Sequence, residues 1–236
     1  MIHGSLCEIC PRRNSGFCGA LLEDVAEDAR ATAEKLQYQA LRSGELIASR
    51  NQSSGDVVVI CGGWGFRFLQ TSDGRRQILK FLLPGDVLSA NLVFEDRFRF
   101  PVKALTDAQV AKFPREKIQA KLFADKSFLT VVANIYIAEN QHAEEMLAVL
   151  GQRSAKQRIA YLLLYLMKRI SAQSVIREHR YRLPVRQQHI ADAVGLTVVH
   201  VNRILGIFRD QGIIELSDGF LQVLNAVELE RVGSIN

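Results

Sequence analysis

The sequence predicts an α+β fold, and three features of the 236-residue chain support this class. Turn signals, among them Gly62-Gly63, recur about every ten residues between Tyr38 and Phe113, with β-rich runs between them, which is typical of a small antiparallel sandwich or barrel. The stretch from Lys117 to Gln173 contains no proline and one glycine, which favours long helices. Near the C-terminus, a helix-turn-helix pattern is followed by a hairpin signal.

These features divide the chain into four expected segments. Residues 1–37 form a cysteine-rich segment with one or two short helices, and residues 38–116 form the β-rich domain. Residues 117–152 form one long helix, and residues 153–236 form a winged helix-turn-helix domain. Ser154 is a plausible N-cap for the helix that follows the long one.

The long helix is a candidate dimerisation helix. Its length, and its position between two different domains, predict that it pairs with a second copy of itself, although such an apolar stripe can also pack on its own domain. Glu139, Asn140 and His142 interrupt the stripe midway and would weaken a paired seam. The expected stripe consists of Leu129, Val132, Tyr136, Ala143, Met146 and Leu150.

Composition and charge distribution narrow the class of protein. With 48% hydrophobic and 23% charged residues, the chain has enough apolar surface for a real core. Residues 151–214 carry 11 basic against 3 acidic side chains, a net charge of +8, whereas the remainder carries −3. A basic C-terminal domain suggests a nucleic acid as its partner, and a solvated basic face is the alternative.

The sequence favours a cytoplasmic protein with no membrane partner. No apolar run reaches the roughly 18 residues of a membrane span, and the N-terminus lacks the basic-then-apolar order of a signal peptide. In a reducing compartment, clustered cysteines are more often metal ligands or redox groups than a disulfide framework.

The strongest motif is QQHIADAVGLTVVHVNRILG, Gln187 to Gly206. Ala191 is small where two helices must approach, and Gly195 lies where the turn needs an unhindered backbone. After the motif, Asp218-Gly219 predicts a hairpin turn and therefore a wing. The apolar positions expected to join the two helices are Ile190, Val194, Leu196, Val201 and Ile204.

The second helix of this motif, from Thr197 to about Gln211, is the candidate DNA reader. Arg203 can form two hydrogen bonds to guanine, Asn202 can read adenine or a phosphate, and Val199 can contact a thymine methyl group. The candidate DNA-binding residues are Thr197, Val199, His200, Asn202 and Arg203. Each of them can instead be an ordinary surface residue.

The run GRRQILKFLLPGD in the β-rich domain, the long helix and the terminal GLTVVHVNRILGIFRDQGII together resemble the Crp/Fnr superfamily of bacterial regulators. The resemblance covers roughly Tyr38 to Val223. It implies a homodimeric transcription regulator with a cyclic-nucleotide-binding-like β jelly roll as its sensor. It also implies an inverted-repeat operator in double-stranded DNA and RNA polymerase as a partner.

The effector of that sensor is not expected to be cyclic AMP. Cyclic-nucleotide binders of the superfamily carry a Gly-Glu-Leu sequence and an Arg-Ser pair, whereas this chain reads SANLVFEDRFRFPVKA from Ser89 to Ala104. The glutamate is replaced near Ala90, and no Arg-Ser exists, although Arg97 and Arg99 are close. A cyclic phosphate needs both an arginine fork and a nest of donors.

The stretch CEICPRRNSGFC resembles the N-terminal cysteine motif of oxygen-responsive Fnr-type regulators, which hold a 4Fe-4S cluster. The resemblance makes Cys7, Cys10 and Cys18 candidate ligands. The family takes a fourth cysteine from a late strand of the sensor domain, where this chain has Ala111. Cys61 is therefore the fourth candidate ligand, and a buried core thiol is its alternative role. His3, Glu8 or a small exogenous ligand could also fill the fourth position.

Three other sensing chemistries remain open. Four cysteines also suit a structural zinc site. Haem could be held by His3, His142 or Cys61 as an axial ligand, because some members of the superfamily sense gases in this way. The thiols could also act without a metal as a redox switch. An iron-sulfur or redox enzyme is not expected, because the sequence contains no Gly-rich phosphate loop, metalloprotease helix or catalytic triad.

Overall fold

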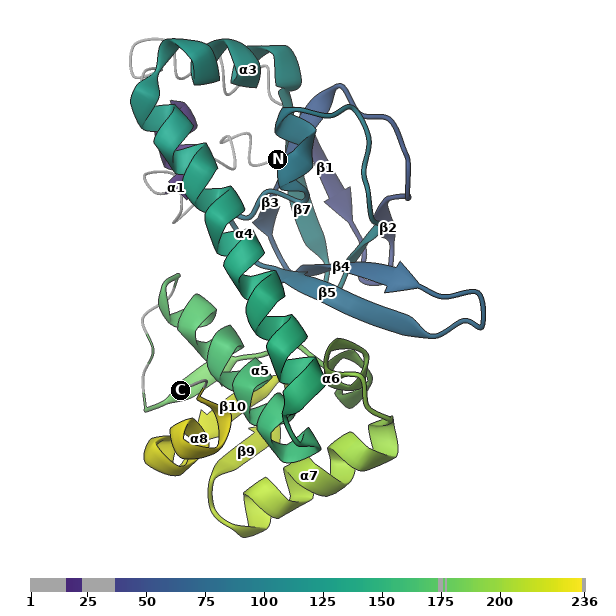
Figure 1. The fold of residues 1–236 in the computed structure, drawn as a ribbon, viewed down its shortest axis with the longest axis vertical. Helices are drawn as coiled ribbons and strands as arrows, with labels where there is room; N and C mark the ends of the chain where they lie inside the picture. Colours follow the sequence, from purple (N-terminus) through teal and green to yellow (C-terminus); the bar gives the residue numbers. More distant parts are fainter. Residues whose placement is uncertain (1–15, 23–36, 174–175, 177, 235–236) are drawn as a thin grey trace, which may run out of the picture. The chain divides into compact units, whose positions relative to one another are not determined.

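The computed structural model describes residues 16–22, 37–173, 176 and 178–234. The described residues fall into two compact units (Figure 1). The first unit comprises the residues up to Leu69 together with Leu79–Gln141, and the second comprises Gln70–Ile78 together with the residues from His142 onward. Most of the expected short helices after the cysteines fall on residues 23–36, which lie outside the described residues.

The β-rich domain consists of two antiparallel sheets, as the jelly-roll prediction required. One sheet has the strand order β1-β7-β3, and the other has the order β2-β6-β4-β5. The strands are β1 (Gln37–Leu41), β2 (Leu46–Ala48), β3 (Asp56–Gly62), β4 (Gly65–Gln70), β5 (Arg76–Leu82), β6 (Val102–Ala104) and β7 (Ala108–Pro114).

The core of the first unit forms around β3. The run from Val57 to Ile60 is buried without alternation, because both faces of the strand are covered. Helix α1 (Gly16–Leu22) contributes Phe17, whose ring meets the ring of Phe113 edge to face at a centroid distance of 6.4 Å. Phe17 also packs on Phe128, at 5.6 Å. Aromatic contacts thus join α1 to the sheet and to the long helix.

The predicted Gly62-Gly63 turn is confirmed, and the structure shows why Gly63 has no side chain. Its φ is +72°, which favours glycine, and a Cβ atom there would lie 2.0 Å from the carbonyl oxygen of Asp107. The β3–β4 turn can therefore pass directly against the start of β7.

One long helix was predicted from Lys117, and the structure instead contains two helices, α3 (Arg115–Ala124) and α4 (Lys126–Gln152). The break lies at Asp125, whose backbone is extended and whose carboxylate accepts hydrogen bonds from the amides of Ser127 (2.8 Å) and Phe128 (3.2 Å). These bonds to the first turn of α4, that of Phe128 above all, lower the pKa of Asp125. The helix restart depends on a side-chain cap rather than on proline or glycine.

The apolar stripe predicted for this helix is divided in the structure. Val132 is buried in the core of the first unit, and Met146 is buried in a cluster of the second. Leu129, Ile137 and Leu147 are instead 46%, 54% and 75% exposed. The alternative that the predicted stripe packs on its own chain therefore describes Val132, Tyr136, Met146 and Leu150, whereas Leu129 and Ala143 are exposed. Leu129 belongs to a second row of side chains that faces solvent.

The second unit contains helices α5 (Ala155–Ser171), α6 (Gln187–Val194), α7 (Val198–Asp210) and α8 (Ala226–Gly233). It also contains a three-stranded sheet of order β8-β10-β9, formed by β8 (Arg180–Arg182), β9 (Ile214–Ser217) and β10 (Phe220–Val223). Ser154 is the N-cap of α5 and forms a capping box with Gln157, as predicted for Ser154. Among the described residues, no single helix is long and apolar enough to span a membrane, although the bent pair α6 and α7 would pass together by length and composition.

Candidate nucleic-acid interface and sensor site

Helices α6 and α7 form the predicted helix-turn-helix. The chain bends by 107° between them, within the range of such motifs. Gly195 ends α6 in the left-handed conformation (φ 65°, ψ 41°), and its amide donates to the carbonyl of Ala191. Ala191 and the apolar positions Ile190, Val194, Val201 and Ile204 are buried as expected, whereas Leu196 is half-buried.

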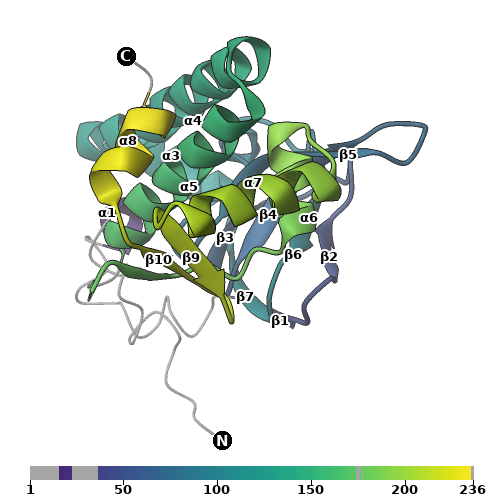
Figure 2. The same ribbon diagram turned by 90° about the horizontal axis from the view of Figure 1, so that it is seen from below.

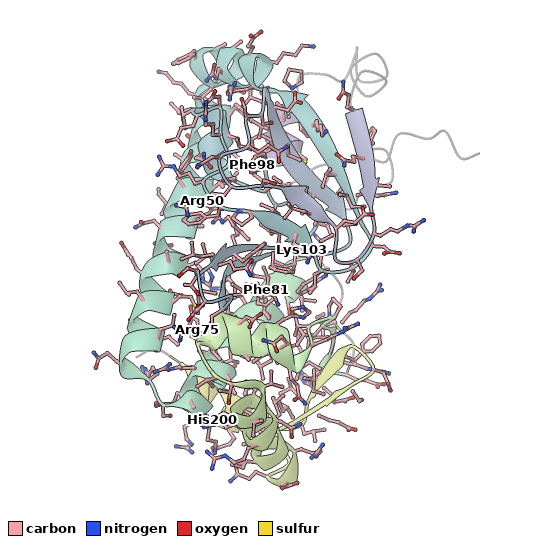
Figure 3. All side chains as sticks on the ribbon, turned by 90° about the vertical axis from the view of Figure 1, so that its right-hand side faces the viewer. Arg50, Arg75, Phe81, Phe98, Lys103 and His200 are labelled. Carbon is pink, nitrogen blue, oxygen red and sulfur yellow. The ribbon has the colours of Figure 1, made fainter. Side chains whose placement is uncertain are left out.

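The N-terminal half of α7 presents the predicted reading residues to solvent. The Thr197 hydroxyl is the N-cap and accepts from the amide of His200 at 3.2 Å. Val199 is 80% exposed, and Asn202 and Arg203 are also exposed. His200 is half-buried and is labelled in Figure 3. Its ring Nε2 lies 3.1 Å from Nη2 of Arg203. This surface combines a cationic fork, an amide and a methyl group, the groups that read base edges.

The hairpin signal produces the wing, and the structure adds a third strand to it. Asp218 and Gly219 both have positive φ, as a type I′ turn requires, and they connect β9 to β10 beside α7 (Figure 2). The sequence reading missed β8, which pairs with β10. On β8, Arg180 places its guanidinium 4.3 Å from the ring centroid of Phe220. Tyr181 is buried between two exposed arginines, an alternation that could have revealed the strand.

A second feature missed by the sequence reading is the contact between α6 and the first residues of β5, within the second unit. Arg76 Nε donates to Asp192 at 2.6 Å, and Gln77 Nε2 donates to the carbonyl of Ala193 at 2.8 Å. Gln188 donates to the other oxygen of Asp192 at 2.6 Å. The first helix of the motif is therefore held by side chains more than 100 residues away in sequence.

His189 lies at this contact and is held neutral. Its Nδ1 accepts the amide of Arg186 at 3.0 Å, which satisfies one backbone donor at the start of α6. Burial lowers the pKa of His189 to about 4, and the positive charge of Arg76 adds to the effect.

In the β-rich domain, the segment that occupies the place of the phosphate-binding residues of cyclic-nucleotide binders is bound to its own neighbours. Arg99 donates to Glu95, which also accepts from Asn91 at 2.9 Å, and Arg99 and Arg97 both have side chains that are 64% exposed. Tyr136 of α4 donates to the carbonyl of Ala90 at 2.7 Å. The guanidinium of Arg99 is therefore paired with Glu95 in this arrangement.

A charged triad joins α4 to the sheet in the first unit. Glu139 accepts from Lys80 of β5 at 2.6 Å and from Arg67 of β4 at 3.3 Å. Burial would raise the pKa of Glu139, but the two cations together hold it below its usual value. Glu139, one of the three polar residues that interrupt the predicted stripe, is thus an internal ion-pair partner.

The described cysteines both border the core of the first unit. Cys18 in α1 is 5% exposed, and the half-buried Cys61 donates weakly to the carbonyl of Val59 at 3.8 Å. Ala111 pairs with Val59 across β7 and β3, and Cys61 lies two residues further along β3, where the register shifts. Cys7, Cys10, His3 and Glu8 lie outside the described residues.

The structure does not bring a metal ligand set together within the residues it describes. No group of three His, Cys, Asp or Glu side chains there is arranged to hold a metal ion. His142, a candidate haem ligand, stacks its ring on that of Tyr165 with 3.9 Å between centroids and 6° between planes. Its ring is therefore packed inside the second unit.

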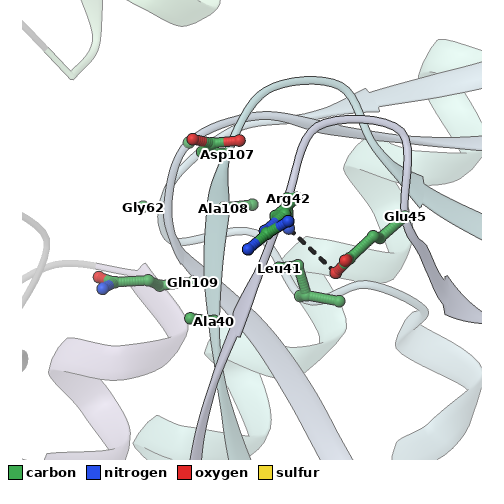
Figure 4. Close-up of a pocket in the computed structure, with 9 residues that line it drawn as sticks. Ala40, Leu41, Arg42, Glu45, Gly62, Asp107, Ala108 and Gln109 are labelled. Atoms are coloured by element: carbon green, nitrogen blue, oxygen red, sulfur yellow. Dashed lines mark hydrogen bonds between the residues drawn. The ribbon is translucent and has the colours of Figure 1, made fainter.

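The first unit also contains a pocket of about 480 Å³ between the ends of β1 and β3 and the start of β7 (Figure 4). Its polar lining residues include Arg42, Glu45, Asp107 and Gln109. The two carboxylates already accept backbone amides, Glu45 from Arg42 at 3.0 Å and Asp107 from Ser43 at 2.8 Å. These acids therefore stabilise the neighbouring turns.

Comparisons with known proteins agree with this architecture. Residues 38–125 match the cyclic nucleotide-binding domain, and residues 157–232 match the Crp-like helix-turn-helix domain. The nitrogen fixation regulation protein FixK of Azorhizobium caulinodans is 30% identical over 198 residues, which cover 84% of this chain and 79% of that protein. The transcriptional activator protein FnrL of Cereibacter sphaeroides is 25% identical, with 89% and 84% covered. The structure of FixK2 from Bradyrhizobium japonicum matches with a TM-score of 0.76 and 26% identity, over 85% of this chain and 98% of that one.

Acidification should destabilise the second unit, because His189 is neutral in the folded chain. Its pKa falls from an ordinary 6.5 to about 4, so the unfolded chain takes up this proton first. The contribution of neutral His189 to the free energy of unfolding is fully present above pH 6.5 and is lost as the pH falls from 6.5 to about 4. Below that pH, His189 causes no further change in stability. We expect the free energy of unfolding to fall by about 1 to 2 kcal/mol, after allowance for solvent screening. Urea unfolding at a series of pH values measures this change.

The matched variant is His189→Gln, which keeps a side-chain acceptor for the Arg186 amide but does not titrate. This variant should lose that part of the pH dependence. An equal loss of stability in both proteins would assign the effect to other groups.

Proposed function

The chain belongs to the Crp/Fnr family of DNA-binding transcription regulators, and we propose that it acts as a homodimer controlled by an oxygen- or redox-sensitive 4Fe-4S cluster. Its relatives are transcription regulators rather than enzymes. The proposed recognition of DNA bases is supported by the exposed N-terminal half of α7, where the guanidinium of Arg203 lies beside His200.

The reading mode follows from the chemistry of the exposed groups. We assign the base contact to Arg203, whose fork matches O6 and N7 of guanine in the major groove. We assign Asn202 to a contact with an adenine or a phosphate, and Val199 to a contact with a thymine methyl group. Thr197 stabilises the helix start through its N-cap bond and lies where a phosphate can approach. Basic residues of the wing, among them Arg182, supply phosphate contacts.

A dimer should read an inverted repeat, and Arg203 should read one base pair in each half. Two recognition helices related by a two-fold axis require half-sites about 34 Å apart. In binding assays with selected operators, Arg203→Ala should weaken the free energy of binding to the preferred operator by roughly 1 to 3 kcal/mol. The variant should also discriminate less between bases at one base pair in each half-site. Equal weakening on all sequences, with a smaller salt slope, would make Arg203 a phosphate contact instead.

Homodimerisation is proposed from the solvent-facing side of α4. We define the outer stripe as Leu129, Ala133, Ile137, Asn140, Glu144 and Leu147, which are all exposed and recur at steps of three or four residues. Such spacing fits the seam of paired helices, and a second copy offers an identical stripe. The two polar positions in the middle would set the register of the pair at a cost in stability.

A charge on the outer stripe should separate the dimer. Ile137→Glu would place two carboxylates at the seam, and we expect the dissociation constant to rise by roughly 100-fold or more. Analytical ultracentrifugation measures the constant. Asn134→Glu adds the same charge to α4 at an exposed position outside the stripe and should leave the constant nearly unchanged. Equal dissociation constants for the two variants would contradict the assigned seam.

The cluster proposal rests on the spacing of Cys7, Cys10 and Cys18 and on the location of Cys61. When bound, a 4Fe-4S cluster would supply an oxygen-labile, redox-active centre. Cys18 and Cys61 both pack in the core of the first unit, and Cys61 lies two residues along β3 from Val59, which pairs with Ala111, where the family carries a cysteine. These positions fit a ligand role for the two described thiols. We further propose that RNA polymerase is the partner through which DNA binding affects transcription.

Protein purified without oxygen should carry iron and sulfide and show broad brown absorption. Cys10→Ser should lose the iron, and Cys18→Ala should do so with the least change in core packing. Cys61→Ser will lose iron only if this thiol is the fourth ligand. A sharp Soret band would indicate haem, and colourless protein with bound zinc would indicate a structural zinc site. Equal iron in wild type and Cys10→Ser would exclude the cluster, and reversible oxidation of metal-free thiols would then support the redox switch.

A further inference from the structure

We propose that Arg76 and Gln77 of β5 are positioning residues for operator binding, because they fix the last turn of α6 and with it the start of the reading helix α7. That turn consists of residues 191–194. The inference rests on the proposed DNA-reading function and extends it to two residues that lie outside the helix-turn-helix.

Asp192 lies in this turn, and both oxygens of its carboxylate are bound. Oδ2 accepts from Nε of Arg76 at 2.6 Å and lies 2.5 Å from Nη2 of the same guanidinium, whereas Oδ1 accepts from Gln188 at 2.6 Å. The side chains of Arg76 and Asp192 are only 24% and 10% exposed. Because water screens this ion pair so little, the pair holds α6 and β5 in one arrangement.

Two backbone carbonyls at the end of α6 are also bound by side chains. The last four carbonyls of a helix have no partner inside the helix, and those of Ala193 and Val194 are among them. Gln77 Nε2 donates to the carbonyl of Ala193 at 2.8 Å, and Arg158 of α5 donates to that of Val194 at 3.4 Å. Arg158 also donates to the carbonyl of Arg153, directly after α4, at 2.9 Å. The end of α6 is therefore held by β5 and α5 together.

The reading helix begins directly after this turn. The amide of Gly195 is bonded to the carbonyl of Ala191, and the hydroxyl of Thr197 caps α7, so the connection between the helices has little freedom. A shift of the end of α6 would therefore move the start of α7. Hydrogen bonds to base edges tolerate a distance range of only about 0.5 Å, so such a shift would weaken sequence-specific contacts first.

Strand β5 continues from this contact into the first unit. The range Gln70–Ile78 belongs to the second unit, whereas Lys80 belongs to the first, where it donates to Glu139 of α4 at 2.6 Å. One strand thus carries buried polar contacts to α6 at its start and to α4 four residues later. A change in the first unit that moves β5 can then alter operator affinity through the end of α6.

The test measures affinity for the preferred operator and for nonspecific DNA, with full-length protein that circular dichroism shows to be folded. The double variant Arg76→Gln with Asp192→Asn removes both charges, so it leaves no buried charge unpaired and keeps the net charge. We expect its operator affinity to fall by roughly tenfold, whereas its nonspecific affinity should stay nearly unchanged. Each single change should cost about as much operator affinity as both together, because either one breaks the same pair.

Three further variants separate the role of this contact from a general effect of charge. Arg75→Gln removes the same charge one residue earlier, from a side chain that is 84% exposed, and should keep both affinities. Arg76→Lys keeps the charge and a donor, so it should recover part of the operator affinity that Arg76→Gln loses. Gln77→Ala removes the donor to the carbonyl of Ala193 without a change of charge and should lower operator affinity by roughly threefold.

Urea unfolding distinguishes positioning from stabilisation alone. If the double variant unfolds more easily but, while folded, keeps the wild-type ratio of operator to nonspecific affinity, the contact only stabilises the second unit and the positioning role is overturned. Loss of base preference in Arg203→Ala together with that result would leave the DNA-reading function intact. If the wild-type protein binds operator and nonspecific DNA equally well, the reading function itself fails and the inference fails with it.

Discussion

The two-sided character of α4 is the constraint on which the rest of the structure depends. One side of the helix buries Phe128 and Val132 in the first unit, and its later turns bury Met146 and Val149 in the second. The outer stripe, in contrast, keeps large apolar side chains in water. A row of exposed apolar side chains on a single helix is unfavourable without a partner, and in the proposed homodimer a second copy of the same stripe would cover it.

The features that could be predicted from the sequence are those fixed by local chemistry. Ser154 and Thr197 are caps because their hydroxyls reach amides three residues away. Gly195 and the Asp218-Gly219 pair adopt positive φ, which few other residues tolerate. These positions determine where helices and the hairpin begin and end. The order of elements from the jelly roll to the wing can therefore be predicted from short segments of the sequence.

The features that were missed depend on residues far apart in sequence or on an ambiguous local signal. Asp125 divides the long helix although no proline or glycine marks the break, because its carboxylate caps the next helix. Periodicity identified an apolar stripe on α4 but could not tell which side the sheet would cover. Arg76 and Asp192 are separated by 116 residues, and Glu139 meets Lys80 across 59 residues. No spacing rule predicts such pairs, since they exist only after the domains have folded.

The two histidines of the helix-turn-helix show how environment gives the same side chain two roles. Both rings accept a hydrogen bond, His189 from the amide of Arg186 and His200 from the guanidinium of Arg203. Burial and the charge of Arg76 protect the neutral state of His189, so the start of α6 keeps its cap at any pH near neutrality. His200 is half-buried on α7 beside the exposed Arg203. The same side chain therefore caps α6 at one position and contacts the guanidinium of Arg203 at the other.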